Sequence, residues 1–229
     1  DITPTVWEEA DGGITAGINK IMGVSAGANI EITPTDSMPD GLTARFAFAK
    51  DADGNTTNDK GVGGDSGLLG SGWDLTLEAT DALHGVTGLT VYGGISRVDQ
   101  VQNSATHDGD KEEEVYGIKY AMGNFSLGWQ QSDDETGRSA TNTNYEHTAW
   151  GVTFQVNDDL SISYGVHESD QNKGGGDTSV TLETTSLQAA YSMGGMSIKA
   201  AMSSVDNASY SATAANDYDV NTIALSLAF

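Results

Sequence analysis

The side chains best suited to bind a metal ion gather between Asp51 and Asp59. Side-chain oxygens recur there at intervals of two to four residues, a spacing typical of calcium loops, at Asp51, Asp53, Asn55 and Asp59. The sixth position of an EF-hand loop is glycine and the twelfth is glutamate, whereas this stretch has Thr56 and Val62. An EF-hand is therefore not expected. Two interpretations stay open: looser Ca²⁺ binding shared by several acidic loops, or a solvated loop rich in Asp and Asn.

Nucleophilic catalysis would need a serine, threonine or cysteine held beside a base. The chain has no cysteine and four histidines, and none of the histidines stands beside a serine motif. His147 and His167 fall in segments of alternating polarity, and His84 and His107 fall between such segments. We therefore do not expect an enzyme, and a hydrolase stays open only as an alternative.

Composition and charge exclude several other classes of protein. The chain has 229 residues, of which 33 are acidic and 10 basic, for a formal charge of −23. This charge argues against binding to nucleic-acid backbones, which needs clustered Lys and Arg. The absence of cysteine excludes a disulfide scaffold. With 37% apolar and 19% charged residues, general disorder is not expected, and no apolar run approaches the roughly 20 residues of a transmembrane helix.

Most of the chain alternates between apolar and polar residues with a period of two. In residues 145–156, Trp150, Val152 and Phe154 lie on one face, opposite small or polar residues. Strict alternation predicts β-strands whose two faces meet different surroundings. Eleven strands are expected, at 24–32, 42–50, 73–81, 89–99, 112–122, 125–133, 145–156, 160–169, 181–193, 196–206 and 218–229.

The two predicted faces differ in an unusual way. The polar faces carry mainly Ser, Thr, Gly, Gln and Ala, with few charges. The apolar faces carry aromatic residues near the strand ends, at Trp73, Tyr116, Tyr120, Trp150 and Tyr191. This pattern is typical of strands with lipid outside and a watery interior.

The predicted connections alternate between short and long. Tight turns are expected at 123–124, 157–159 and 194–195, and long polar loops at 51–72, 100–111, 134–144, 170–180 and 207–217. We therefore predict an all-β, transmembrane, antiparallel up-and-down β-barrel with short periplasmic turns and long extracellular loops. Because bacterial barrels have an even number of strands, residues 14–23 could supply a short twelfth strand. The alternative is that further strands precede Asp1.

Two segments are similar to segments of a known family. They are the last predicted strand, which ends in Leu225-Ser226-Leu227-Ala228-Phe229, and the hairpin at 189–198, which reads Ala-Ala-Tyr-Ser-Met-Gly-Gly-Met-Ser-Ile. In these segments the chain resembles bacterial outer-membrane general porins, most of all the 16-stranded alphaproteobacterial type. The resemblance implies that Phe229 is an assembly signal for the barrel-assembly machinery. It also implies a homotrimer in the outer membrane of a Gram-negative bacterium, in contact with lipid and lipopolysaccharide. Residues 1–23 would be the end of an inward-folded constriction loop, and 24–229 would be barrel strands.

A porin forms a water-filled channel for passive diffusion of ions and small hydrophilic solutes, and needs no cofactor. The predicted lumen faces carry the bases Arg45, Lys119 and Lys199 and the acids Glu31, Asp74 and Glu78. The resemblance suggests that these bases form a wall opposed by loop acids, which would be Glu8, Glu9 and Asp11. The alternative is that all these charges are isolated and solvated. The excess of acids predicts a mild bias towards cations.

Two further expectations concern the outer face and the rival function. Arg97 has the parity of the apolar face and is expected to extend to lipid head groups at the outer rim. The rival function is a closed outer-membrane barrel that works as an adhesin or structural protein through its extracellular loops. A sealed twelve-stranded barrel would favour that rival.

Overall fold

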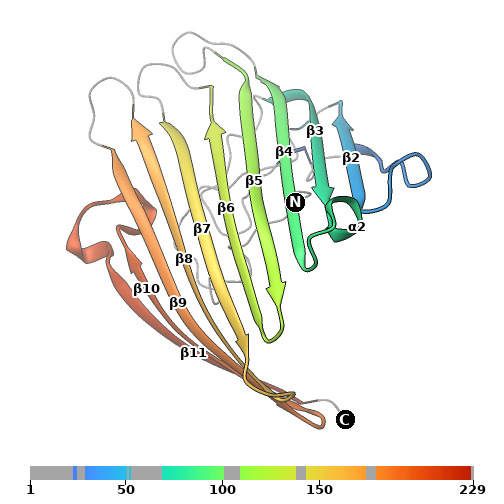
Figure 1. Ribbon diagram of the computed structural model, residues 1–229. Coiled ribbons are helices and arrows are strands. Elements are labelled where there is room, and N and C mark those ends of the chain that lie inside the picture. The colour runs from blue at the N-terminus through green and yellow to red at the C-terminus, as the bar shows by residue number, and fades with distance from the viewer. Residues whose placement is uncertain are drawn as a thin grey trace.

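The protein forms one antiparallel β-sheet. Its computed structural model describes residues 23–24, 29–50, 52, 69–100, 109–137, 143–173 and 179–227. The sheet has eleven strands (Figure 1): β1 (Asn29–Ile32), β2 (Leu42–Ala49), β3 (Leu69–Ala79), β4 (Leu89–Gln100), β5 (Lys111–Met122), β6 (Phe125–Glu135), β7 (Thr143–Gln155), β8 (Leu160–Lys173), β9 (Val180–Met193), β10 (Met196–Asp206) and β11 (Tyr218–Leu227).

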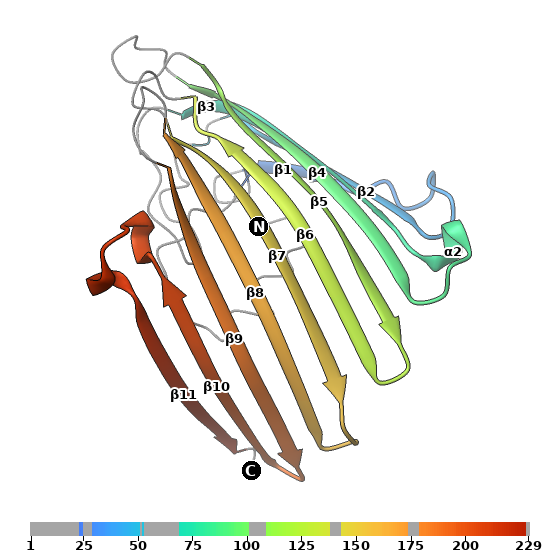
Figure 2. The ribbon, with the colours of Figure 1, turned by 60° about the vertical axis from the view of Figure 1, so that its left-hand side comes forward.

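Each strand pairs only with its neighbours in the chain, so the spatial order β1 to β11 is also the sequence order. This up-and-down arrangement confirms the predicted fold class. The sheet is strongly twisted along its width (Figure 2), as right-handed strand twist requires.

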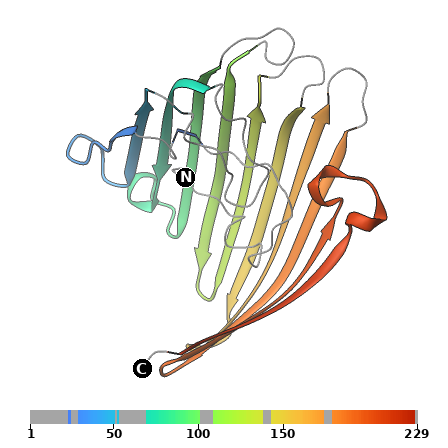
Figure 3. The ribbon, with the colours of Figure 1, turned by 180° about the vertical axis from the view of Figure 1, so that it is seen from behind.

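The connections alternate in length as predicted. At one end of the sheet, β5 and β6, β7 and β8, and β9 and β10 are joined by residues 123–124, 156–159 and 194–195. At the other end, β10 and β11 are joined by residues 207–217, which contain the 3₁₀ turns η1 (Ala208–Tyr210) and η2 (Ala214–Asn216). Figure 3 shows this connection beside β9 and β10.

Several strand ends differ from the prediction by two residues or more. β3 begins at Leu69 instead of residue 73, and β8 extends to Lys173 instead of residue 169, so parts of the predicted loops 51–72 and 170–180 belong to strands. β1 begins at Asn29, and Gly23 and Val24 form a turn instead of the start of a strand. β3 ends at Ala79, because residues 81–84 form the short helix α2 (Asp81–His84). Gly85 ends this helix in the left-handed conformation, with φ of 77°, which glycine adopts without a Cβ penalty. Among the described residues, no helix combines the length and apolar character needed to cross a membrane.

The exposure of the two faces is the reverse of that in a water-soluble protein. On one face, which we call the outer face, large apolar side chains are exposed, such as Ile223 at 80% and Met122 at 59%. The other face, which we call the polar face, contains most of the buried polar and charged residues, including Asp74, Asp134 and His147. Because large exposed apolar surfaces are rare on soluble monomers, the sheet must meet an apolar environment on its outer side.

Candidate functional site

The polar face contains all six described residues that were predicted to line a pore. The strand register connects them, because residues paired across an antiparallel sheet point to the same side. The pairs that establish this are Glu31 with Ala47, Ala47 with Asp74, Glu78 with Thr43, Arg45 with Thr76, Lys119 with Thr90 and Lys199 with Ala190.

Arg45 lies among three of the predicted acids. Its partner across the β2–β3 pair is Thr76, whose neighbours on the same face are Asp74 and Glu78. Glu31 on β1 pairs with Ala47, two residues from Arg45. Diagonal neighbours of this kind are about 7–8 Å apart, within reach of long side chains. The structure thus places this base and these acids on one section of the wall.

The three predicted bases lie far apart in the sheet. Arg45 is on β2, Lys119 on β5 and Lys199 on β10. Since neighbouring strands are about 4.8 Å apart, the five strand intervals between Lys119 and Lys199 correspond to roughly 24 Å along the sheet. The two lysines therefore belong to separate sections of the polar face.

The remaining predicted positions lie outside the described residues. These are the loop acids Glu8, Glu9 and Asp11, the oxygen ligands Asp51, Asp53, Asn55 and Asp59, and the terminal Phe229. Within the described part of the chain, no group of three or more His, Asp or Glu side chains is placed to hold a metal ion.

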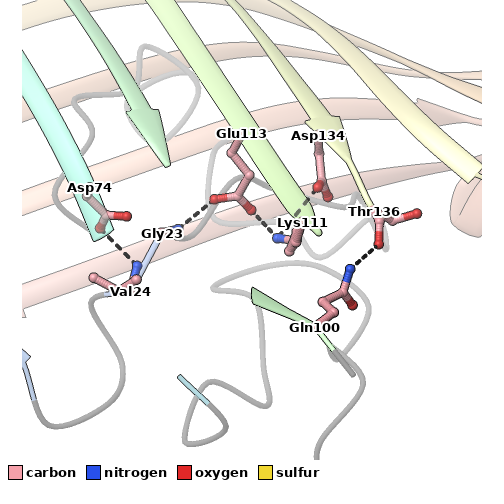
Figure 4. A network of polar contacts seen from close by, with 8 residues as sticks. All are labelled: Gly23, Val24, Asp74, Gln100, Lys111, Glu113, Asp134 and Thr136. Carbon is pink, nitrogen blue, oxygen red and sulfur yellow. Dashed lines mark hydrogen bonds and ion pairs between the residues drawn. The ribbon is translucent and has the colours of Figure 1, made fainter. Parts of the chain in front are cut away.

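The turn at Gly23 and Val24 is held against the polar face by two carboxylates (Figure 4). The Val24 N–H donates to Asp74 Oδ2 at 2.8 Å, and the Gly23 N–H donates to Glu113 Oε2 at 2.7 Å. Val24 is fully buried, in a cluster with Ala47, Ala49, Ala52 and Val98. Segment 23–24, which joins the predicted inward loop (residues 1–23) to the predicted first strand (24–32), is therefore packed onto the sheet wall.

Only glycine fits at position 23. Its φ is +64°, and a Cβ there would lie 2.4 Å from Asp74 Oδ2. A side chain would therefore both strain the backbone and displace the carboxylate that binds the Val24 N–H.

Lys111 completes this network. It forms ion pairs with Glu113 on its own strand and with Asp134 on β6, the second with 3.5 Å between Nζ and Oδ1 (Figure 4). Glu113 and Asp134 are almost fully buried, and they are paired across β5 and β6. Burying two carboxylates side by side is costly unless a cation neutralises them. The alternation of polarity does not by itself predict this cluster, although Lys111 and Glu113 share the parity of Lys119.

A second cluster lies further along the polar face. The rings of His147 and His167 are 5.6 Å apart between centroids, and His147 stacks on Tyr145 at 6.3 Å. Tyr210 of η1 packs against Tyr145 at 5.1 Å, and its hydroxyl is 2.7 Å from Ser169 Oγ. The 207–217 connection therefore folds inward and covers part of the sheet wall.

This inward fold uses an unusual backbone. Asn207, Ser209 and Tyr210 have φ of 55°, 55° and 56°, values that residues other than glycine rarely adopt. Asn207 is fixed by two hydrogen bonds: its N–H donates to Asp217 Oδ1 at 2.9 Å, and its Nδ2 donates to the Thr181 carbonyl at 2.7 Å. These bonds and the burial of Tyr210 offset the backbone strain.

Arg97 lies on the outer face, as its parity predicts. Its guanidinium forms an ion pair with Glu112 and lies 3.7 Å from Glu114. Glu112 is its direct partner across β4 and β5. Arg97 thus has a carboxylate partner on the neighbouring strand, and its contact with lipid head groups stays a prediction.

The charges of the described strands are divided unevenly between the faces. The register places equal numbers of acids and bases on the polar face. The five acids are Glu31, Asp74, Glu78, Glu113 and Asp134, and the five bases are Arg45, Lys111, Lys119, Lys173 and Lys199. On the outer face, β5 to β11 carry ten acids near the long-loop end: Glu112, Glu114, Asp133, Glu135, Glu146, Glu168, Asp170, Glu183, Asp206 and Asp219. The negative excess of the strands therefore lies on the outer rim.

Comparison with known proteins identifies the fold. No model of a known protein family matches the chain, and no curated protein sequence matches it. Among solved structures, OmpF of Salmonella typhi in complex with daunomycin matches at a TM-score of 0.64 with 14% identity, over 87% of this chain and 61% of that chain. A porin structure refined at 1.8 Å matches at 0.58 with 12% identity, over 87% and 60% of the two chains. OmpT of Vibrio cholerae matches at 0.56 with 11% identity, over 86% and 62%.

At 11–14% identity these similarities describe the fold and no more. The eleven-stranded sheet is folded like the barrel wall of outer-membrane porins. The chain spans about three-fifths of the length of each of these proteins, since the matches cover 60–62% of their chains.

Proposed function

We propose that the chain is part of an outer-membrane porin, a water-filled channel through which ions and small hydrophilic solutes diffuse passively. The observation that carries this proposal is the exposure of the two faces. Large apolar side chains are exposed on the outer face, while Ser, Thr, Gly and Gln residues predominate on the other face. This arrangement suits a barrel with lipid outside and water inside.

Several finer features of the proposal rest on the resemblance. They are a 16-stranded barrel of the alphaproteobacterial type, a homotrimer, contact with lipopolysaccharide and insertion by the barrel-assembly machinery through Phe229. The described strands number eleven, and single-chain bacterial barrels have an even number, so closure needs at least one further strand. Binding of Ca²⁺ by the acidic extracellular loops belongs to the proposal as well.

The proposed channel is mildly selective for cations. The chain carries 33 acids and 10 bases, and a negative mouth potential raises the local concentration of cations. Because acids and bases are equal in number on the polar face of the described strands, we assign the bias to the rim and loops. The bias should then weaken at high ionic strength, since exposed charges are screened beyond about 10 Å at 0.1 M salt.

Planar-bilayer recording of the purified full-length protein tests this function. Insertion should give stepwise conductance, and a KCl gradient should give a reversal potential of the sign expected for a cation-selective pore. The same sample after boiling in detergent is the control for conductance caused by the detergent itself. An intact barrel that inserts without conductance would overturn the proposal and favour a closed barrel acting through its loops.

A further inference from the structure

A groove in the middle of the sheet has the properties of a solute-binding site. Its volume is about 290 Å³, and every described residue that lines it comes from β4 to β8 or their turns. Because these strands are paired on both sides, the groove does not depend on either edge of the sheet. Ligand pockets for drug-sized molecules start at about 300 Å³, so this groove suits a small solute.

Glycines form the floor of the groove. Lys119 on β5 pairs with Gly128 on β6, which pairs with Gly151 on β7. Neither glycine places a side chain above the sheet, so a depression extends from Lys119 across two strands. The Lys119 side chain lines this depression.

Hydroxyl groups surround the floor. Ser126, Thr153 and Ser163 are successive partners across β6, β7 and β8, and Thr90 is the partner of Lys119 on β4. Directly paired side chains have Cβ atoms about 5 Å apart. The groove thus presents a row of three hydroxyls, each able to donate and accept a hydrogen bond. This row lies two residues along the strands from the row formed by Lys119 and the two glycines.

The charge of the groove contrasts with that of the chain. Lys119 is the single charged residue among the described residues that line it, in a chain with a formal charge of −23. An ammonium beside hydroxyls is complementary to a small molecule that has one anionic group and several hydroxyls.

We infer that this groove, which we call the Lys119 groove, binds a sugar acid: a single-ring solute with one carboxylate and several hydroxyls. Lys119 receives the carboxylate, and Ser126, Thr153 and Ser163 bind the ring hydroxyls above the glycine floor. The inference rests on the proposed channel, because it describes a place where a permeating solute pauses. It requires no chemical change in the solute.

Isothermal titration of the full-length protein in detergent with D-glucuronate tests the site without requiring an open channel. Glucuronate should bind more tightly than glucose, which lacks the carboxylate, and than acetate, which lacks the ring. Lys119→Met should weaken glucuronate binding about tenfold or more, as expected for a charge-assisted hydrogen bond of 1.5–3 kcal/mol. Thr153→Val, which keeps the side-chain shape, should weaken it several-fold.

Lys199→Met is the matched control, because Lys199 is a lysine on the same face that does not line the groove. It should leave glucuronate binding unchanged. Equal losses in the two lysine variants would overturn the inference, as would equal binding of glucuronate and acetate. In bilayers, glucuronate should block the wild-type current more than that of Lys119→Met. Absence of conductance with intact binding would contradict the channel alone, whereas normal conductance without binding would contradict the groove alone.

Discussion

The ion-pair network at Lys111 allows a sharp test of how the sheet wall is stabilised. Lys111→Met keeps most of the aliphatic side chain but removes the charge between Glu113 and Asp134, which are 4% and 1% exposed. Removing one partner of a buried ion pair costs about 3–5 kcal/mol, because the other charge stays buried without compensation. Lys111 is itself 22% exposed, so water offsets part of this cost. We expect a loss of about 3 kcal/mol in the free energy of unfolding.

Urea unfolding in lipid vesicles, followed by tryptophan fluorescence, measures this loss. The triple variant Lys111→Met, Glu113→Gln, Asp134→Asn should recover most of the stability. Neutral amides remove the uncompensated charge, and the amide oxygen introduced by Glu113→Gln can still accept from the Gly23 N–H. Lys199→Met, the same substitution at an exposed lysine of the same face, should change stability by less than about 1 kcal/mol, as expected of a surface substitution. A single variant as stable as the wild type would refute the reasoning, and so would a triple variant no more stable than the single one.

Two further substitutions test other parts of the sheet. Asp133→Asn should stabilise the protein by about 0.5–1 kcal/mol, because Asp133 is paired directly with Glu114 and Glu146 and like charges in that position repel; an unchanged urea midpoint would contradict this. Tyr210→Phe should destabilise it by about 1 kcal/mol through loss of the buried hydroxyl contact with Ser169. In a double-mutant cycle with Ser169→Ala, the two losses should be less than additive, and full additivity would exclude a direct contact.

The strands and their two faces could be predicted because both follow from local sequence. Alternation with a period of two identifies a strand and also divides its residues between the faces. Arg45, Lys119 and Lys199 were assigned to the polar face from parity alone, and the register agrees. The ends of the strands were less predictable. The strand was predicted to continue to residue 81 because no glycine or proline interrupts residues 80–81, whereas in the structure the helix α2 begins at Asp81 and is ended by Gly85.

The buried network could not be predicted, because it depends on which residues face each other across strands. Parity places Lys111 and Glu113 on the polar face, but only the β5–β6 register brings Asp134 beside them. The hydrogen bonds of Gly23 and Val24 join positions 90 and 50 residues apart in the chain. Likewise, a polar stretch such as 207–217 gives no local sign that Tyr210 turns back onto the sheet.

The division of charge between the faces follows from the cost of burial. A carboxylate on the polar face, where the wall is covered by segment 23–24 or by η1, loses much of its hydration and needs a cation or N–H donors nearby. Acids and bases are therefore matched there. On the outer rim, water and counterions reach the carboxylates, so unmatched acids such as Glu168 and Glu183 accumulate at little cost. In the proposed channel, selectivity that arises from net charge would then come from the rim and the loops, while the wall would discriminate solutes through individual groups such as Lys119.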